Sequence, residues 1–234
     1  MVNRQTSLKI RKTHRYLGLF LGIQFLLWIV SGLYFSWTNI DKIHGDHFRK
    51  TPVTKVRFDS LISPSKLHLT EGIYTISLKD IGGKPYYFIN NKNLYNAKTG
   101  ILKTGITKKE ALLVAKKYIK DSMKVATVSL INKVPPKHEY RERLLPAYVI
   151  SYKGKDNLKA YISQKDGQFQ TVRHQQWRWF DFLWMTHTMD YQNRDNINTT
   201  TLRIFSLLGL ITVMSGFLLW FVTSPTVRKI LKNK

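Results

Sequence analysis

Two nearly uncharged stretches, one near each end of the chain, constrain what this sequence can fold into more than any other feature. The first, residues 16–37, contains no charged side chain, and the second, residues 202–222, contains only Arg203 close to its start. At about 1.5 Å of rise per residue, a helix of either length spans roughly the 30 Å hydrocarbon core of a bilayer. The sequence therefore predicts two transmembrane helices, at residues 14–38 and 201–223, with the long side chain of Arg203 reaching the interface.

A secretory signal peptide would also begin with basic residues and continue into an apolar run. The apolar core of a signal peptide is about 7–15 residues long and ends in small residues. The first stretch is longer and ends in Tyr34, Phe35 and Trp37, aromatic residues that are typical of membrane interfaces. We therefore expect a retained membrane anchor.

The distribution of charge predicts the orientation of these helices. The net charge is +24, and all 14 acidic residues lie between Asp41 and Asp195. The terminal segments, residues 1–13 and 224–234, are basic and contain no acid, which by the positive-inside rule places both in the cytoplasm. The region between the helices then lies outside. Its excess of lysine and arginine suits anionic lipid headgroups or an anionic ligand, and the aromatic residues beside the spans favour the lipid bilayer over nucleic acid as the partner.

Residues 39–176 have the pattern of a small α+β domain. Alternating apolar residues at 73–78, followed by a glycine-rich turn, predict an antiparallel sheet. Thr107 and Glu110 have the spacing of a capping box, so we expect a helix to begin there and to lay its apolar face across the sheet.

A sequence pattern is repeated within this domain. The order of proline, aromatic strand, second strand and glycine turn occurs first at residues 85–100 and again at residues 146–167. Duplication of one unit and mere similarity between two hairpins both explain the repeated pattern, and we favour duplication. Residues 177–200 are different: tryptophan and phenylalanine crowd their first part, which predicts a segment in the membrane interface and then a polar loop.

Polar and small residues inside the first span predict helix contacts. Gly18 and Gly22 permit the close approach of a helix, either the second span or another copy of the chain. Gln24 and Ser31 are expected to hydrogen-bond across the helix pair.

Three groups of residues resemble the PepSY-associated transmembrane family. They are the basic, histidine-containing start of the first helix at residues 11–18, a middle group at residues 106–111 and 146–167, and a final group at residues 184–187 and 215–220. The resemblance implies an α+β membrane protein of the bacterial inner membrane. Two transmembrane helices would bracket an external PepSY-like domain, in which a helix packs on a small antiparallel sheet, duplicated if the repeated pattern reflects a repeated unit.

The same resemblance implies haem b as a cofactor, because some larger relatives look like reductases of iron–siderophore complexes that carry electrons through histidine-bound haem. Neutral imidazole is a good axial ligand of haem iron. His14 lies at the inner end of the first span and His187 outside the second, about 30 Å apart, so they cannot ligate one haem together. His44 and His47 are the expected outer partners of His187, and a second copy of His14 is the corresponding inner partner.

Each histidine also has a plainer interpretation. His14 can belong to the cationic anchor, His187 can hydrogen-bond within the aromatic segment, and His44 and His47 can lie in a solvated loop. The remaining histidines, His68, His138 and His174, are expected at the surface.

No motif in the sequence predicts a self-contained catalytic site. There is no P-loop, zinc-protease motif or nucleophile–base pair, and the absence of cysteine excludes disulfides and thiolate metal sites. We therefore assign no catalytic residue. The resemblance implies a binding or accessory component in the metal or redox physiology of the cell envelope, linked to iron–siderophore complexes or haem.

Two alternatives to that function stay open. One is a haem-bearing subunit of a transmembrane reductase, completed by further copies or by a partner membrane protein, because two helices give one chain an incomplete electron path. The other is a PepSY module that modulates a protease.

Overall fold

The computed structural model describes residues 4–53 and 56–225 of the 234-residue chain. The described chain divides into two compact units. The helical unit consists of Met1–Trp37 and Asp181–Lys234, and the sheet unit is Thr38–Phe180.

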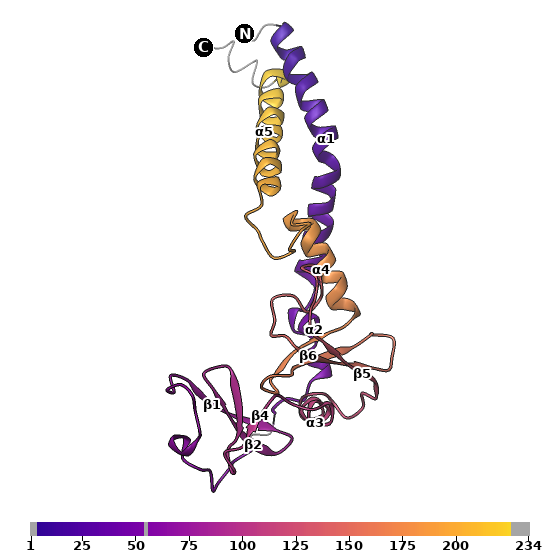
Figure 1. Ribbon diagram of the computed structural model, residues 1–234. Coiled ribbons are helices and arrows are strands. Elements are labelled where there is room, and N and C mark those ends of the chain that lie inside the picture. Colours follow the sequence, from indigo (N-terminus) through magenta and orange to yellow (C-terminus); the bar gives the residue numbers. More distant parts are fainter. Residues whose placement is uncertain (1–3, 54–55, 226–234) are drawn as a thin grey trace. The chain divides into compact units, whose positions relative to one another are not determined.

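Two long helices, α1 (Arg4–Trp37) and α5 (Thr200–Thr223), form the helical unit and lie side by side (Figure 1). Both are long and apolar enough to cross a membrane. Their outer faces expose large apolar side chains such as Leu19 and Phe217, which water would disfavour and lipid accepts. Helix α1 begins ten residues before the predicted span, so the basic N-terminal segment continues the same helix.

The close contacts between α1 and α5 use glycines of α5. A Cβ atom at Gly209 would lie 3.2 Å from the ring of Phe25, whereas a Cβ at Gly18 or Gly22 would meet nothing within 4 Å. The expectation that Gly18 and Gly22 bring the second span close is therefore wrong. Their use by another copy of the chain stays a prediction.

Helix α4 (Gln175–Thr188) contains the aromatic-rich segment, and its residues from Asp181 onward belong to the helical unit. A tight turn follows it, in which the carboxylate of Asp190 accepts hydrogen bonds from the backbone N–H groups of Gln192, Asn193 and Asn196. The hydroxyl of Thr199 then caps the first turn of α5.

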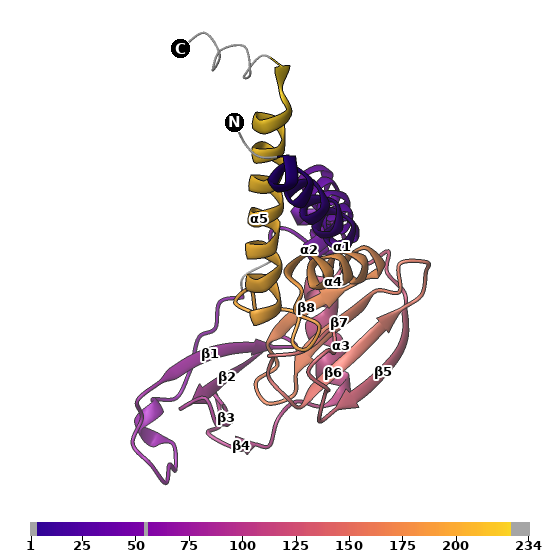
Figure 2. The same ribbon diagram turned by 90° about the horizontal axis from the view of Figure 1, so that it is seen from above.

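Two four-stranded antiparallel sheets with the same strand order form the sheet unit (Figure 2). The first sheet contains β1 (Ile76–Ile81), β2 (Lys84–Ile89), β3 (Asn93–Asn96) and β4 (Leu102–Lys103). The second contains β5 (Val125–Ile131), β6 (Ala147–Tyr152), β7 (Lys159–Ser163) and β8 (Phe169–Arg173). The repeated sequence pattern falls on β2 and β3 in the first sheet and on β6 and β7 in the second. The sequence missed β8, which follows the turn at Gly167.

Helix α3 (Lys108–Tyr118) connects the two sheets. Its capping box is present as predicted: the hydroxyl of Thr107 accepts from the Glu110 N–H, and the Glu110 carboxylate accepts from the Thr107 N–H. The apolar face of α3 packs with both sheets in one core, where Ile150 and Ile162 are fully buried. Burial of this face stabilises the helix on the sheets.

The start of the sheet unit also packs into this core. Helix α2 (Ile40–His44), the 3-10 turn η1 (Asp46–Phe48) and a second 3-10 turn η2 (Pro64–Lys66) follow α1 in the chain. Phe48 joins the core that surrounds α3.

His174 is buried, with a relative exposure of 1%, and its Nε2 donates to the carbonyl of Ile43 at 3.1 Å. The expectation of a surface position for His174 is therefore wrong, because the ring fills the space beside η1 at the end of β8.

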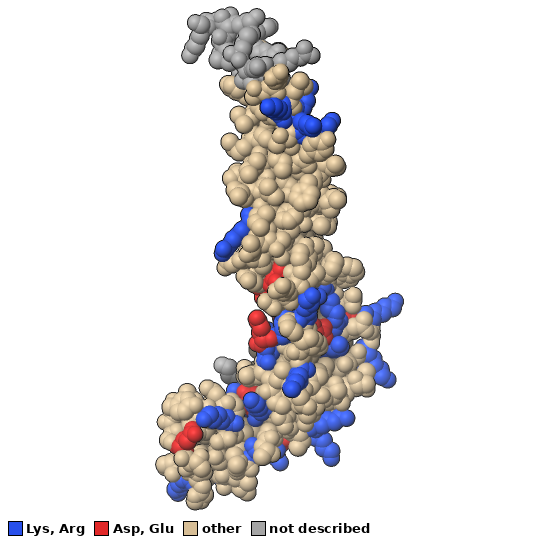
Figure 3. All heavy atoms as spheres, turned by 45° about the horizontal axis from the view of Figure 1, so that its top comes forward, with Lys and Arg blue, Asp and Glu red and all other residues tan. Residues whose placement is uncertain are grey.

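Basic side chains are spread over the sheet unit (Figure 3). On the two long helices they gather toward the ends, and the middle of the helical surface shows no charged side chain in the same view. One carboxylate, that of Glu139, forms ion pairs with two of these basic side chains. It accepts from Arg178 at 2.6 Å and from the hydroxyl of Tyr161 at 2.6 Å, and it pairs with Lys159 at 3.1 Å. Burial alone would raise the pKa of Glu139, but the hydrogen bonds from Arg178 and Tyr161 lower it to about 2.

We expect acid to destabilise the sheet unit through Glu139. Its folded-state pKa lies below the ordinary value of 4.5, so its contribution to stability is present above that value and is lost as the pH falls toward 2. Glu139→Gln should lower the free energy of unfolding at pH 7 by about 1–3 kcal/mol and flatten its decline below pH 5. Urea unfolding followed by tryptophan fluorescence measures both effects. The control, Glu71→Gln, removes an exposed ion pair with Lys92 and should change little; equal effects of the two substitutions would contradict the prediction.

Candidate functional site: two serine-bound histidines

His14 and Ser215 join the two long helices. The Nδ1 atom of His14 on α1 lies 2.8 Å from the hydroxyl oxygen of Ser215 on α5. That hydroxyl donates its only hydrogen to the carbonyl of Thr212, at 2.7 Å. The Ser215 oxygen must therefore accept from Nδ1–H of His14, which means that in the neutral imidazole the lone pair lies on Nε2.

The neighbouring glycine makes room for this imidazole. A Cβ atom at Gly216 would lie 3.1 Å from Cε1 of His14, tighter than ordinary van der Waals contact. Any larger residue would push the ring away from α5. Glycine at this position therefore lets the histidine lie against the second helix.

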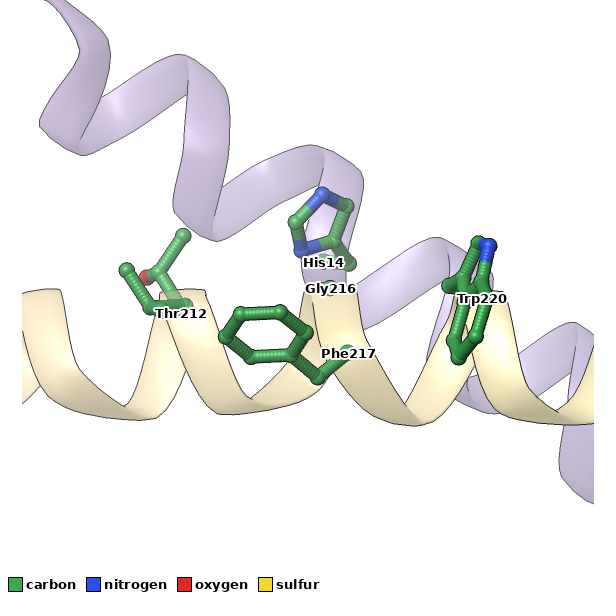
Figure 4. A pocket seen from close by; sticks show the side chains of 6 residues that line it. His14, Thr212, Gly216, Phe217 and Trp220 are labelled. Carbon is green, nitrogen blue, oxygen red and sulfur yellow. The ribbon is translucent and has the colours of Figure 1, made fainter.

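His14 lies at one wall of an apolar groove of about 570 Å³ within the helical unit. Figure 4 shows its ring against α5, with one ring nitrogen directed away from that helix. The other lining residues are Thr212, Val213, Gly216, Phe217 and Trp220. Among the described residues, Nε2 of His14 has no hydrogen-bond partner, so it is a nitrogen that the groove offers for coordination of a ligand.

His187 repeats this arrangement at the other end of α1. Its Nδ1 lies 2.7 Å from the hydroxyl oxygen of Ser31, whose hydrogen is donated to the carbonyl of Leu27 at 2.6 Å. By the same count of hydrogens, His187 carries its proton on Nδ1 and a lone pair on Nε2. Burial lowers the pKa of His187, which favours the neutral ring that a metal requires.

Aromatic residues of α1 hold the end of α4 that carries His187. The indole N–H of Trp28 donates to the backbone carbonyl of His187 at 2.8 Å, one of the carbonyls that a helix end leaves without a partner. The ring of Phe35 meets the imidazole edge-on, at 5.6 Å between centroids. These contacts fix both the backbone and the ring of His187.

The two histidines are too far apart to bind one metal centre together. Ser31, which contacts His187, lies 17 residues beyond His14 on the same helix, or about 25 Å along its axis. The two histidines therefore belong to two separate candidate sites, each with one imidazole.

His44 and His47 lie in the sheet unit, and both are exposed. Gly45, with φ of +80°, ends α2 directly after His44, and His47 belongs to η1. The two histidines therefore do not share one helix face. The ring of His47 lies 3.9 Å from that of Phe48 and 5.4 Å from that of His174. Their pairing with His187 stays a prediction, and the described residues contain no cluster of three or more acidic or histidine side chains that could hold a metal ion.

The sequence pointed to the histidines but missed the role of their serine partners. Ser31 was expected to bond across the helix pair, and it bonds instead to His187 of α4. No hydrogen bond was predicted for Ser215. A signal was present, since a serine and a histidine in two otherwise apolar spans need polar partners in lipid. Gln24 is also buried, at 8% exposure, and its amide nitrogen has no partner among the described residues, so a bond across the helix pair is not formed there.

The arrangement defines a class: a membrane protein in which two apolar helices bracket an α+β unit of two antiparallel sheets, with one oriented imidazole near each end of the first helix. A family model described as the PepSY-associated TM region matches residues 11–232. The chain belongs to this family. Comparison with curated proteins and with solved structures gave no significant match.

We expect both histidines to carry their proton on Nδ1. Nitrogen-15 NMR of histidine-labelled protein in detergent distinguishes the two tautomers by chemical shift. Ser215→Ala should change the signal of His14 only, and Ser31→Ala that of His187 only, because each removes one acceptor. Ser36→Ala is the control, since this serine of α1 donates to the Leu33 carbonyl and contacts neither histidine in the described part of the chain. Protonation on Nε2 in the unsubstituted protein would contradict the assignment.

Proposed function

We propose that this PepSY protein is a binding component in the metal or redox physiology of the bacterial envelope, and that His14 is an axial ligand for haem b. The observation that carries the proposal is the hydrogen bond between Nδ1 of His14 and Ser215, which holds the imidazole at the wall of an apolar groove and leaves Nε2 for a ligand. A haem ligand needs a neutral imidazole whose other nitrogen donates a hydrogen bond, and His14 has this arrangement.

The surroundings of His14 fit the same ligand. Phe217 and Trp220 offer aromatic walls to a planar apolar group, and Gly216 leaves the imidazole its position. Haem, when bound, would supply one-electron chemistry. The chain's own contribution is to orient the ligating nitrogen through Ser215, to exclude water with the apolar walls, and to keep the Nδ1 proton on the histidine.

One chain supplies one histidine to this groove among its described lining residues. A second axial imidazole would come from His14 of another copy or from a partner membrane protein. This requirement favours, as a second candidate function, a haem-bearing subunit of an oligomeric transmembrane reductase. His187 would serve a separate outer site, since it presents the same nitrogen about 25 Å away along α1.

Absorbance of the purified protein tests the haem proposal. Protein expressed with ample haem supply and solubilised in detergent should show a Soret band that shifts on dithionite reduction. His14→Ala should abolish most of the band. Ser215→Ala should keep the band but change the midpoint potential, because the hydrogen bond that raises the basicity of the ligand is lost. His68→Ala replaces an exposed histidine and should change nothing. A colourless unsubstituted protein would overturn the proposal.

We also propose that both termini are cytoplasmic and that the sheet unit lies outside the inner membrane. The chain contains no cysteine, so a single introduced thiol reports its own location. A membrane-impermeant maleimide should label Lys92→Cys, in the sheet unit, on intact spheroplasts. Thr6→Cys, on α1 before the apolar stretch, should be labelled only after permeabilisation. The reverse pattern would overturn this orientation.

A further inference from the structure

Strand β5 forms one edge of the second sheet (Figure 2). It pairs with β6 on one side, and a bulge next to Ala126 leaves residues 127–131 in regular register. On the other side, the described residues supply no hydrogen bond to its backbone N–H and C=O groups. Such a row of unbonded groups is a template for another strand.

The other edge strands of the sheet unit carry charge. Strand β1 holds the corresponding place in the first sheet, and its Lys79 and Asp80 form ion pairs with Asp166 and Lys117. Strand β8 contains Arg173, and β4 is only two residues long. Charges and shortness of this kind protect an edge from unwanted pairing. Strand β5, with the sequence VATVSLI, has no charged residue and no proline, and it exposes Val125 and Leu130.

A groove of about 270 Å³ adjoins the start of β5. Its apolar part lies between α3 and the second sheet and is lined by Leu112, Leu113, Ile119, Met123, Val125 and Tyr152. Lys116 and Lys120 line the same groove, and Lys124 immediately precedes the strand. Asp121, the only acid in the described lining, is already paired with Lys50 at 2.9 Å. The groove therefore combines an apolar floor with a basic rim.

We propose that the β5 edge and this groove bind an extended peptide segment of acidic and apolar character. The segment adds a strand to β5, places one apolar side chain in the groove beside Val125, and directs a carboxylate to Lys116 and Lys120. Main-chain hydrogen bonds would supply affinity, while the groove and the lysines would supply specificity. A second copy of this chain is a poorer occupant, because its β5 sequence, VATVSLI, offers no carboxylate to Lys116 and Lys120.

Binding of a designed peptide to the full-length protein in detergent tests this proposal. The probe is a fluorescein-labelled peptide that alternates valine and threonine and ends in two glutamates, and its anisotropy reports binding. We expect saturable binding. The same peptide with alternate backbone nitrogens methylated should not bind, because it cannot pair with a strand edge. The double substitution Lys116→Glu and Lys120→Glu should weaken binding at least about tenfold, whereas Lys98→Glu, at an exposed turn of the first sheet, should not.

Three results would overturn the proposal. The first is that the unmethylated fluorescein-labelled peptide shows no saturable binding up to about 1 mM. The second is a methylated peptide that binds as tightly as the unmodified one, which would exclude strand addition. The third is disulfide formation between two copies of a Ser129→Cys variant that the peptide does not inhibit, because β5 would then be occupied by another copy. None of these results depends on haem, so they leave the function of His14 untouched.

Discussion

The hydrogen-bonding requirement of polar groups in lipid underlies the arrangement of the helical unit. Water is absent from the bilayer core, so a histidine or serine in a spanning helix needs a partner within the protein. His14 and Ser215 satisfy each other across α1 and α5, and the serine returns its hydrogen to its own helix. The cost of leaving the imidazole N–H alone favours the helix pairing that brings His14 to Ser215. The same hydrogen bond leaves Nε2 of His14 without a partner among the described residues.

Much of the fold could be predicted from local sequence. Length and hydropathy predicted both spans, and the spacing of Thr107 and Glu110 predicted the start of α3, because these signals depend on residues that are near in sequence. The contact between α1 and α5 could not be predicted in this way. Gly18 and Gly22 carried the familiar small-residue spacing, yet Gly209 and Gly216 make the close contacts. Which face of each helix meets the other depends on side chains from both, and neither helix alone contains that information.

The candidate site was predicted in part, for the same reason. Histidines in and beside apolar spans stand out in a sequence, so His14 and His187 were identified at once. Their serine partners lie 201 and 156 residues away in the chain, and only the packed helices bring them together. His174 shows the opposite failure: its polar side chain suggested the surface, but a single carbonyl, that of Ile43, satisfies the ring where it is buried. A polar residue type therefore predicts a need for a partner and does not predict exposure.

The two sheets show how one topology can serve two purposes. In both, the chain passes through four antiparallel strands in sequence order, so β1 and β5 hold equivalent edges. The two charged side chains of β1, Lys79 and Asp80, both form ion pairs, and the partner of Asp80 is Lys117 of α3. Lys116, the preceding residue, points into the groove beside β5. Successive residues on a helix project about 100° apart, so one helix placed between the sheets can secure the first edge while offering positive charge beside the second. An unbonded edge with no partner would be an aggregation hazard with no compensating use. A peptide bound at the basic groove next to β5 would give this edge such a use.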